Sequence, residues 1–144
     1  MKKQKLTLLS VLLFILIFSS CAKEDENGPA SILLSKEWKR GMVDKNPATN
    51  PAGRILYYAV QNCQKDDTFR FGANKALTIN QGANKCVNNE PATTTVSYTY
   101  NETNKELIID SFKYTLAEES KAQIKYYAPM SSQTGYDYIV YLLE

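Results

Sequence analysis

Histidine is absent from the chain of 144 residues. Its absence excludes Ser-His-Asp and Cys-His catalytic sets, histidine acid–base pairs and histidine metal sites. The glycine-rich runs that cradle phosphates in nucleotide-binding proteins are also missing. Three cysteines are too few, and too widely spaced, for a thiolate metal site. The sequence therefore predicts a protein that is not an enzyme and that has no cofactor, no metal site and no catalytic residue.

Long apolar runs are scarce as well. The run from Leu6 to Phe18 is shorter than the roughly 20 residues that a membrane-spanning helix needs. It follows three lysines and precedes two serines and Cys21, which is the layout of a secretory signal peptide. The serines before Cys21 resemble the lipobox of bacterial lipoproteins, in which the cysteine becomes the lipidated mature N-terminus. This resemblance implies a signal peptide over residues 1–20 and acyl chains such as palmitate on Cys21; a plain signal peptide is the alternative.

Residues 21–31 are expected to form an acidic tether. Lys23-Glu24-Asp25-Glu26, just after Cys21, resembles the surface-export signal of Bacteroidetes lipoproteins. The resemblance implies anchoring of the protein by its lipid to the outer membrane, with the domain facing the cell exterior. A solvated tether without an export role is the alternative reading of the same residues.

Little net charge remains once a signal peptide is removed. Residues 1–20 contain three of the 17 basic residues, which leaves 14 basic against 15 acidic side chains, or about −1. Nucleic-acid binding depends on a basic surface that neutralises phosphates. The sequence therefore predicts no nucleic-acid partner.

Two cysteines remain to pair if Cys21 is lipidated. Cys63 and Cys86 flank a predicted β-hairpin, in which residues 68–71 and 76–80 alternate polar and apolar side chains around a Gly-Ala-Asn-Lys turn. An antiparallel hairpin brings its two ends together, and an oxidising compartment favours a bond between them. The sequence predicts a Cys63–Cys86 disulfide, with two buried free thiols as the alternative. Asp66 and Asp67 are interpreted as a polar turn at the strand entry.

Short alternating segments dominate the rest of the chain. The predicted class is all-β, an antiparallel up-and-down meander of about eight strands in one domain over residues 32–144, closed as a barrel or, alternatively, flattened into a β-sandwich. A helical turn over 32–35 is expected to plug one end of the domain, and a helix or irregular crossover is expected over 54–62. The expected strands cover residues 36–43, 68–71, 76–80, 94–101, 106–110, 111–116, 121–128 and 136–143.

This pattern resembles the lipocalin-like domains of Bacteroidetes lipoproteins, over roughly residues 32 to 144. The residues that carry the resemblance are Leu33-Leu34-x-x-x-Trp38, Cys63-x-Lys65-Asp66-Asp67-x-Phe69-x-Phe71, Lys85-Cys86 and Leu107-x-Ile109. The resemblance implies a small up-and-down barrel with a disulfide beside its second strand and no assigned chemistry.

Ten tyrosines are the remaining candidates for a site. Their rings and hydroxyls suit a cavity for a small apolar or amphipathic ligand, although filling a small barrel is the simpler use of them. The predicted function is an envelope lipoprotein that binds such a ligand; the alternative is a solid surface module that binds a protein, including an envelope protein partner, or a glycan. The ligand-binding residues are not assigned. The tyrosines considered are Tyr57, Tyr98, Tyr100, Tyr114, Tyr126 and Tyr138.

Overall fold

A computed structural model describes residues 29–144. The expected signal peptide over residues 1–20, the lipidation site Cys21 and most of the tether over 21–31 lie outside the described residues. The described elements are, in order, α2 (Pro29–Leu34), β1 (Trp38–Lys39), β2 (Ile55–Tyr57), β3 (Thr68–Phe71), β4 (Ala76–Asn80), β5 (Thr93–Asn101), β6 (Glu106–Ile109), β7 (Phe112–Glu119), β8 (Ile124–Pro129) and β9 (Tyr138–Leu143). Single 3₁₀ turns cover Pro47–Thr49, Asn62–Gln64 and Ser132–Thr134.

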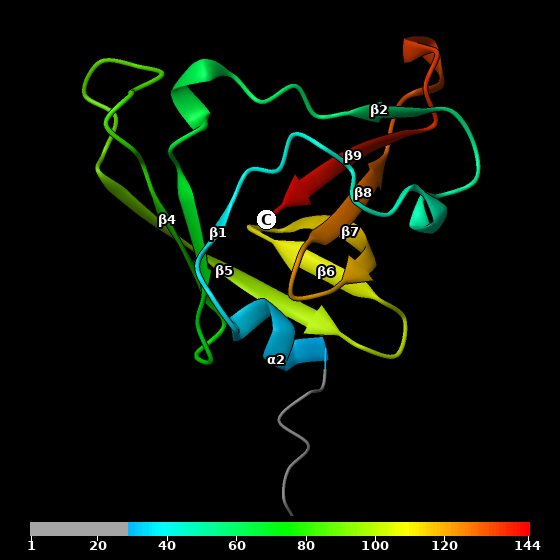
Figure 1. Ribbon diagram of the computed structural model, residues 1–144, viewed down its shortest axis with the longest axis horizontal. Coiled ribbons are helices and arrows are strands. Elements are labelled where there is room, and N and C mark those ends of the chain that lie inside the picture. Colours follow the sequence, from blue (N-terminus) through cyan, green and yellow to red (C-terminus); the bar gives the residue numbers. More distant parts are fainter. Residues whose placement is uncertain (1–28) are drawn as a thin grey trace, which may run out of the picture.

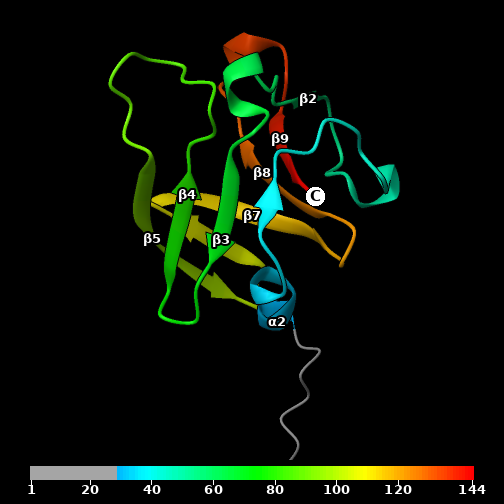
Figure 2. The same ribbon diagram turned by 60° about the vertical axis from the view of Figure 1, so that its left-hand side comes forward.

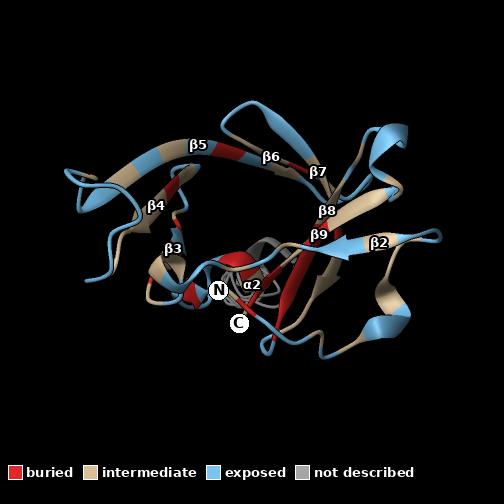
Figure 3. Cartoon of the chain, turned by 90° about the horizontal axis from the view of Figure 1, so that it is seen from above, coloured by how far each residue is buried: buried red, intermediate tan, exposed pale blue. Residues whose placement is uncertain are grey.

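Nine strands form one sheet that curls into a half-barrel (Figures 1 and 3). Their order is β1-β3-β4-β5-β6-β7-β8-β9-β2, so strands from β3 to β9 each pair with their neighbours in the sequence. These pairings are antiparallel, and β2 pairs with β9 in parallel. The prediction of an all-β antiparallel meander is confirmed, and the strands form one curled sheet rather than the two packed sheets of a β-sandwich.

The two sides of the curled sheet meet at the edge of β9 that does not pair with β8. The backbone nitrogen of Lys39 donates to the carbonyl of Glu144, and that of Gly41 donates to the carbonyl of Leu142, each over 2.9 Å. The first half of the same edge pairs with β2. Figure 2 shows β1 lying between β3 and β9. We call the line where residues 39–41 meet residues 142–144 the seam.

Helix α2 lies at one end of the half-barrel (Figure 1). It begins at Pro29, whose fixed φ suits the first helical position. Leu33 is 1% exposed, and its carbonyl accepts a hydrogen bond of 2.9 Å from the indole Nε1 of Trp38, which is fully buried. The helix contacts β3 and β7. The expectation that a helical turn over residues 32–35 plugs an end of the domain is confirmed.

The concave side of the sheet is packed with apolar side chains. Alternation along β3, β4, β6 and β8 sends every second residue inward, as the pleat of a strand requires. The buried cluster comprises Leu33, Trp38, Phe69, Phe71, Leu77, Tyr98, Leu107, Leu116, Ile124, Tyr126 and Leu143. Side chains therefore fill the end of the half-barrel nearest α2.

One expectation needs correction. The segment 54–62 was expected to be a helix or irregular crossover, but its first part is strand β2, because the open edge of β9 offers it backbone partners. In the last strand, the inner cluster receives Leu143 and Tyr141, while Val140 and Leu142 lie buried on the other face of β9. Since β9 is covered on both faces, alternation alone does not identify its inner one.

Candidate functional site

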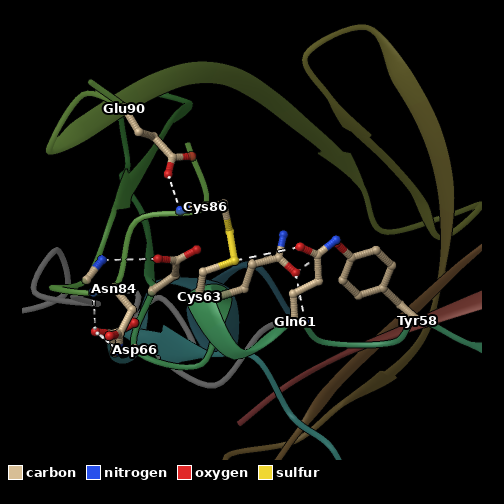
Figure 4. Close-up of a disulfide and its surroundings, with 10 residues drawn as sticks. Tyr58, Gln61, Cys63, Asp66, Asn84, Cys86 and Glu90 are labelled. Atoms are coloured by element: carbon tan, nitrogen blue, oxygen red, sulfur yellow. Dashed lines mark hydrogen bonds between the residues drawn. A yellow bond between two sulfur atoms is a disulfide. The ribbon is translucent and has the colours of Figure 1, made fainter. Parts of the chain in front are cut away.

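The predicted disulfide is present. Cys63 lies in the 3₁₀ turn before β3, Cys86 lies in the loop after β4, and their sulfur atoms are 1.98 Å apart (Figure 4). The turn is held by a reciprocal capping box between Gln61 and Gln64. The side chain of Gln64 also accepts a hydrogen bond of 3.0 Å from the hydroxyl of Tyr58. The disulfide segment therefore also positions Tyr58, which belongs to the site described next.

The paired aspartates organise the loop that leads to Cys86. The amide nitrogen of Gly82 donates to Asp67 Oδ1 over 3.0 Å, and that of Asn84 donates to Asp66 Oδ2 over 3.2 Å (Figure 4). A Cβ at Gly82 would lie 2.0 Å from the carboxyl carbon of Asp66, so this approach requires glycine. The hydrogen bond from the Asn84 backbone is the largest influence on Asp66 and lowers the pKa of its carboxyl. The interpretation of these carboxylates as structural is supported.

A partly buried arginine lies among aromatic rings beside the seam. The guanidinium carbon of Arg40 lies 4.4 Å from the ring centroid of Phe69, 5.2 Å from that of Tyr58 and 6.0 Å from that of Tyr141. Its Nη1 donates to the hydroxyl of Tyr126 over 3.2 Å. We call these five residues the Arg40 site. The three rings lie within the range at which a cation is attracted to an aromatic face.

The charge of Arg40 is not balanced by a neighbouring carboxylate. No ion pair among the described residues involves Arg40. Its Nε is buried and has no hydrogen-bonding partner there. A buried donor without a partner costs about 1–3 kcal/mol, and more when the group is charged. The site therefore has an unused capacity to bind an acceptor, preferably an anionic one.

The tyrosines of the site form a continuous stack. Tyr141 packs nearly parallel to Tyr126 and against Tyr58, with ring centroids 5.1 Å apart in both pairs. Tyr114 meets Tyr126 and Tyr141 edge to face, at 5.2 and 5.7 Å. Burial raises the pKa of both Tyr114 and Tyr141, and the charge of Arg40 opposes this increase only in part. These hydroxyls are therefore neutral donors at physiological pH.

A small pocket adjoins Arg40 at the seam. Its volume is about 20 Å³, which is room for about one water molecule. Its walls include Gly41, Met42, Tyr58 and Val60, together with the outer face of β9. Met42 and the next residue, Val43, are 64% and 69% exposed. This pocket, which we call the seam pocket, therefore has the cation of Arg40 in its wall, a small opening and an apolar rim.

A second cluster of charged residues lies on the outer face of β8. Lys125 is fully buried, and its Nζ lies 2.8 Å from Asp44 Oδ1, 2.6 Å from the carbonyl of Asn46 and 2.9 Å from Thr49 Oγ1. The hydroxyl of Tyr57 donates to the other oxygen of Asp44 over 2.6 Å. Burial acts to raise the pKa of Asp44, but these bonds outweigh it and lower that pKa. The Lys125 cluster fastens the loop before β2 to the sheet, so its charges are already satisfied.

The tyrosines considered from the sequence take different places. Tyr98 and Tyr126 belong to the core, and Tyr100 and Tyr114 pack against it. Tyr57 lies in the Lys125 cluster and also lines the pocket beside Arg40, and Tyr138 packs against Tyr127. The sequence analysis did not identify Arg40, Tyr58, Phe69 or Tyr141 as a site. An arginine between apolar residues in the first strand was the available signal for Arg40.

Neither a metal centre nor a membrane-spanning helix is found in the described part of the chain. No group of three or more acidic or sulfur-bearing side chains there is arranged to hold a metal ion. No helix of residues 29–144 has the length and apolarity to span a bilayer.

The fold and the site together define a small all-β protein with a curled sheet, a structural disulfide and one unpaired arginine among tyrosines. Comparison of the chain with protein-family models, curated proteins and solved structures finds no match. The function must therefore be argued from the residues themselves.

Proposed function

We propose that the protein is an envelope-anchored lipoprotein whose lipocalin-like domain binds a small amphipathic ligand at the Arg40 site. The observation that carries this proposal is the unpaired charge of Arg40 beside a small pocket lined by both polar and apolar residues. Binding sites for small molecules combine apolar and aromatic walls with a few polar groups that fix orientation. The Arg40 site has this composition, whereas the charges of the Lys125 cluster are already used.

The ligand lies at the seam rather than deep inside the half-barrel. Pockets for drug-sized ligands have volumes of about 300–1,000 Å³. The seam pocket, at about 20 Å³, admits only one small group of a ligand. The remainder of the molecule would rest outside, on the exposed side chains of Met42 and Tyr57. No chemical step is proposed, and the protein acts by binding alone.

The proposed location rests on the first 26 residues. The apolar run, Cys21 and the acidic residues after it support an outer-membrane lipid anchor and a domain facing the cell exterior. More than one acyl chain is needed for stable attachment, which a diacylglyceryl cysteine with an amide-linked chain provides.

The experiment that tests binding is calorimetric titration of the full chain in detergent with octanoate and with 1-octanol. The proposal predicts saturable heats with at least one of the two probes. Absence of saturable binding of both probes, with the protein folded by circular dichroism, would refute it.

The second candidate function is recognition of a protein or glycan by the outer surface of a solid domain. It is favoured by the packed interior and by Phe112, which is 67% exposed at the start of β7. Replacement of Phe112 by Ser would weaken capture of such a partner and leave probe binding at Arg40 unchanged. Unchanged capture of the partner by Phe112→Ser would instead support the ligand-binding proposal.

A further inference from the structure

The ligand's polar end can be inferred from the groups that the Arg40 site leaves unused. Arg40 Nε is buried without a partner, and Nη1 is bound only to the hydroxyl of Tyr126. The hydroxyl of Tyr141 has no hydrogen-bonding partner among the described residues, and its ring lies 6.0 Å from the guanidinium carbon. All of these groups donate hydrogen bonds, and none of them carries negative charge.

From this arrangement we infer that the Arg40 site binds a monocarboxylate with an apolar body. The inference rests on the proposed function and names the chemical class of its ligand. A carboxylate is acceptor-only, and hydrogen bonds between charged partners are about twice as strong as neutral ones. A neutral alcohol would leave the charge of Arg40 unpaired.

The size and walls of the pocket agree with this class. A space of about 20 Å³ accommodates one oxygen-sized group beside Arg40. Beyond this space, Met42 exposes an apolar side chain at the rim. A carboxylate oxygen in the pocket therefore places a hydrocarbon chain or ring over exposed apolar surface, where its burial is favourable.

The surrounding rings restrict where the arginine can lie. Phe69 and Tyr58 both contact the guanidinium group, and Tyr58 is in turn held by Gln64 beside the disulfide. Such a group loses little conformational freedom when a ligand binds, which favours affinity. Arg40 is therefore held in place for an anion.

The test compares two probes that differ only at the polar end. The full chain in detergent is titrated at pH 7 with octanoate and with 1-octanol, and both titrations are repeated on Arg40→Met. Arg70→Met, which removes an exposed arginine from β3, is the matched control. The wild type and the control are expected to bind octanoate at least tenfold more tightly than 1-octanol. Arg40→Met is expected to lose this preference, so that octanoate binds no more tightly than 1-octanol.

Several outcomes would overturn the inference. Equal affinity of the wild type for the two probes would leave the proposed amphipathic ligand intact and exclude the carboxylate. An octanoate preference that survives in Arg40→Met would place the anion elsewhere. If Arg40→Met does not fold, Arg40→Lys decides: it retains the charge without Nε, and a preference several-fold below that of the wild type is expected. An undiminished preference in Arg40→Lys would contradict a role for Arg40 Nε.

Discussion

Removal of the Cys63–Cys86 bond is expected to destabilise the domain by an amount that follows from its loop. The two cysteines are 23 positions apart, so the bond closes a loop of 24 residues. In the chain-entropy model, this closure restricts the unfolded chain by about 3.5 kcal/mol at 25 °C. The double variant Cys63→Ala/Cys86→Ala should lose about that much free energy of unfolding.

Urea denaturation of the full chain measures this loss. With a slope of about 1–3 kcal/mol per molar for a small domain, the midpoint should fall by about 1–3.5 M. The slope itself should rise, because the unfolded variant exposes more surface than the cross-linked chain. Wild-type protein treated with a reducing agent is the control, and its midpoint should match that of the double variant.

A midpoint within 0.5 M of the oxidised wild type would refute this reasoning. It would mean that the contacts of Asp66 and Asp67 with the loop keep the unfolded chain closed without the bond. A midpoint that falls while the slope decreases would instead indicate that the native domain has partly unfolded.

Four further predictions follow. Lys125→Met should cost about 3–5 kcal/mol in urea denaturation, because it leaves the carboxylate of Asp44 buried without its cation; a loss below 1 kcal/mol would contradict this. The pKa of Asp44 is lowered in the folded state, so its stabilisation is present at neutral pH and is lost as the pH falls through that lowered pKa. Stability measured from pH 7 to pH 3 should therefore fall less in Asp44→Asn than in the wild type, and equal slopes would exclude the effect. Leu33→Ala should cost about 2–5 kcal/mol, since this side chain of α2 is buried in the core, and an unchanged thermal midpoint would show that the helix does not seal the core. Cys21→Ala should move the protein from the membrane fraction to the soluble fraction of its host, and retention in the membrane would refute the lipid anchor.

The sheet could be predicted from the sequence because most of its strands are covered on one face. Phe69 and Phe71 alternate with polar residues in β3, and Leu77 alternates with them in β4, so each strand shows which side is buried. The same hairpin places Cys63 near Cys86, which made their bond predictable. The helical turn at Leu33 followed from a short apolar segment before the first strand.

The misassigned elements depend on tertiary contacts that leave no periodic signal. Strand β2 has three residues and forms because the edge of β9 is open beside it. Strand β7 extends through a register shift between Leu116 and Glu118, where a turn was expected. Bulges of this kind insert a residue without changing composition, so alternation fails across them.

The Arg40 site could not be predicted from the sequence for a related reason. Its residues come from five separate segments, around positions 40, 58, 69, 126 and 141, and only closure of the seam brings them together. Tyr58 lies outside the helices and strands, so no repeat of apolar residues in the sequence predicts which way its side chain points. The sequence showed many tyrosines but not which of them surround a cation.

Native mass spectrometry of the full chain, purified in mild detergent from its own membrane, tests the central claim most directly. Binding of an apolar carboxylate at Arg40 predicts a fraction of molecules that carry an added organic acid, and this added mass should disappear in Arg40→Met but persist in Arg70→Met. The same bare mass in all three folded proteins, or an added mass that survives the loss of Arg40, would contradict it.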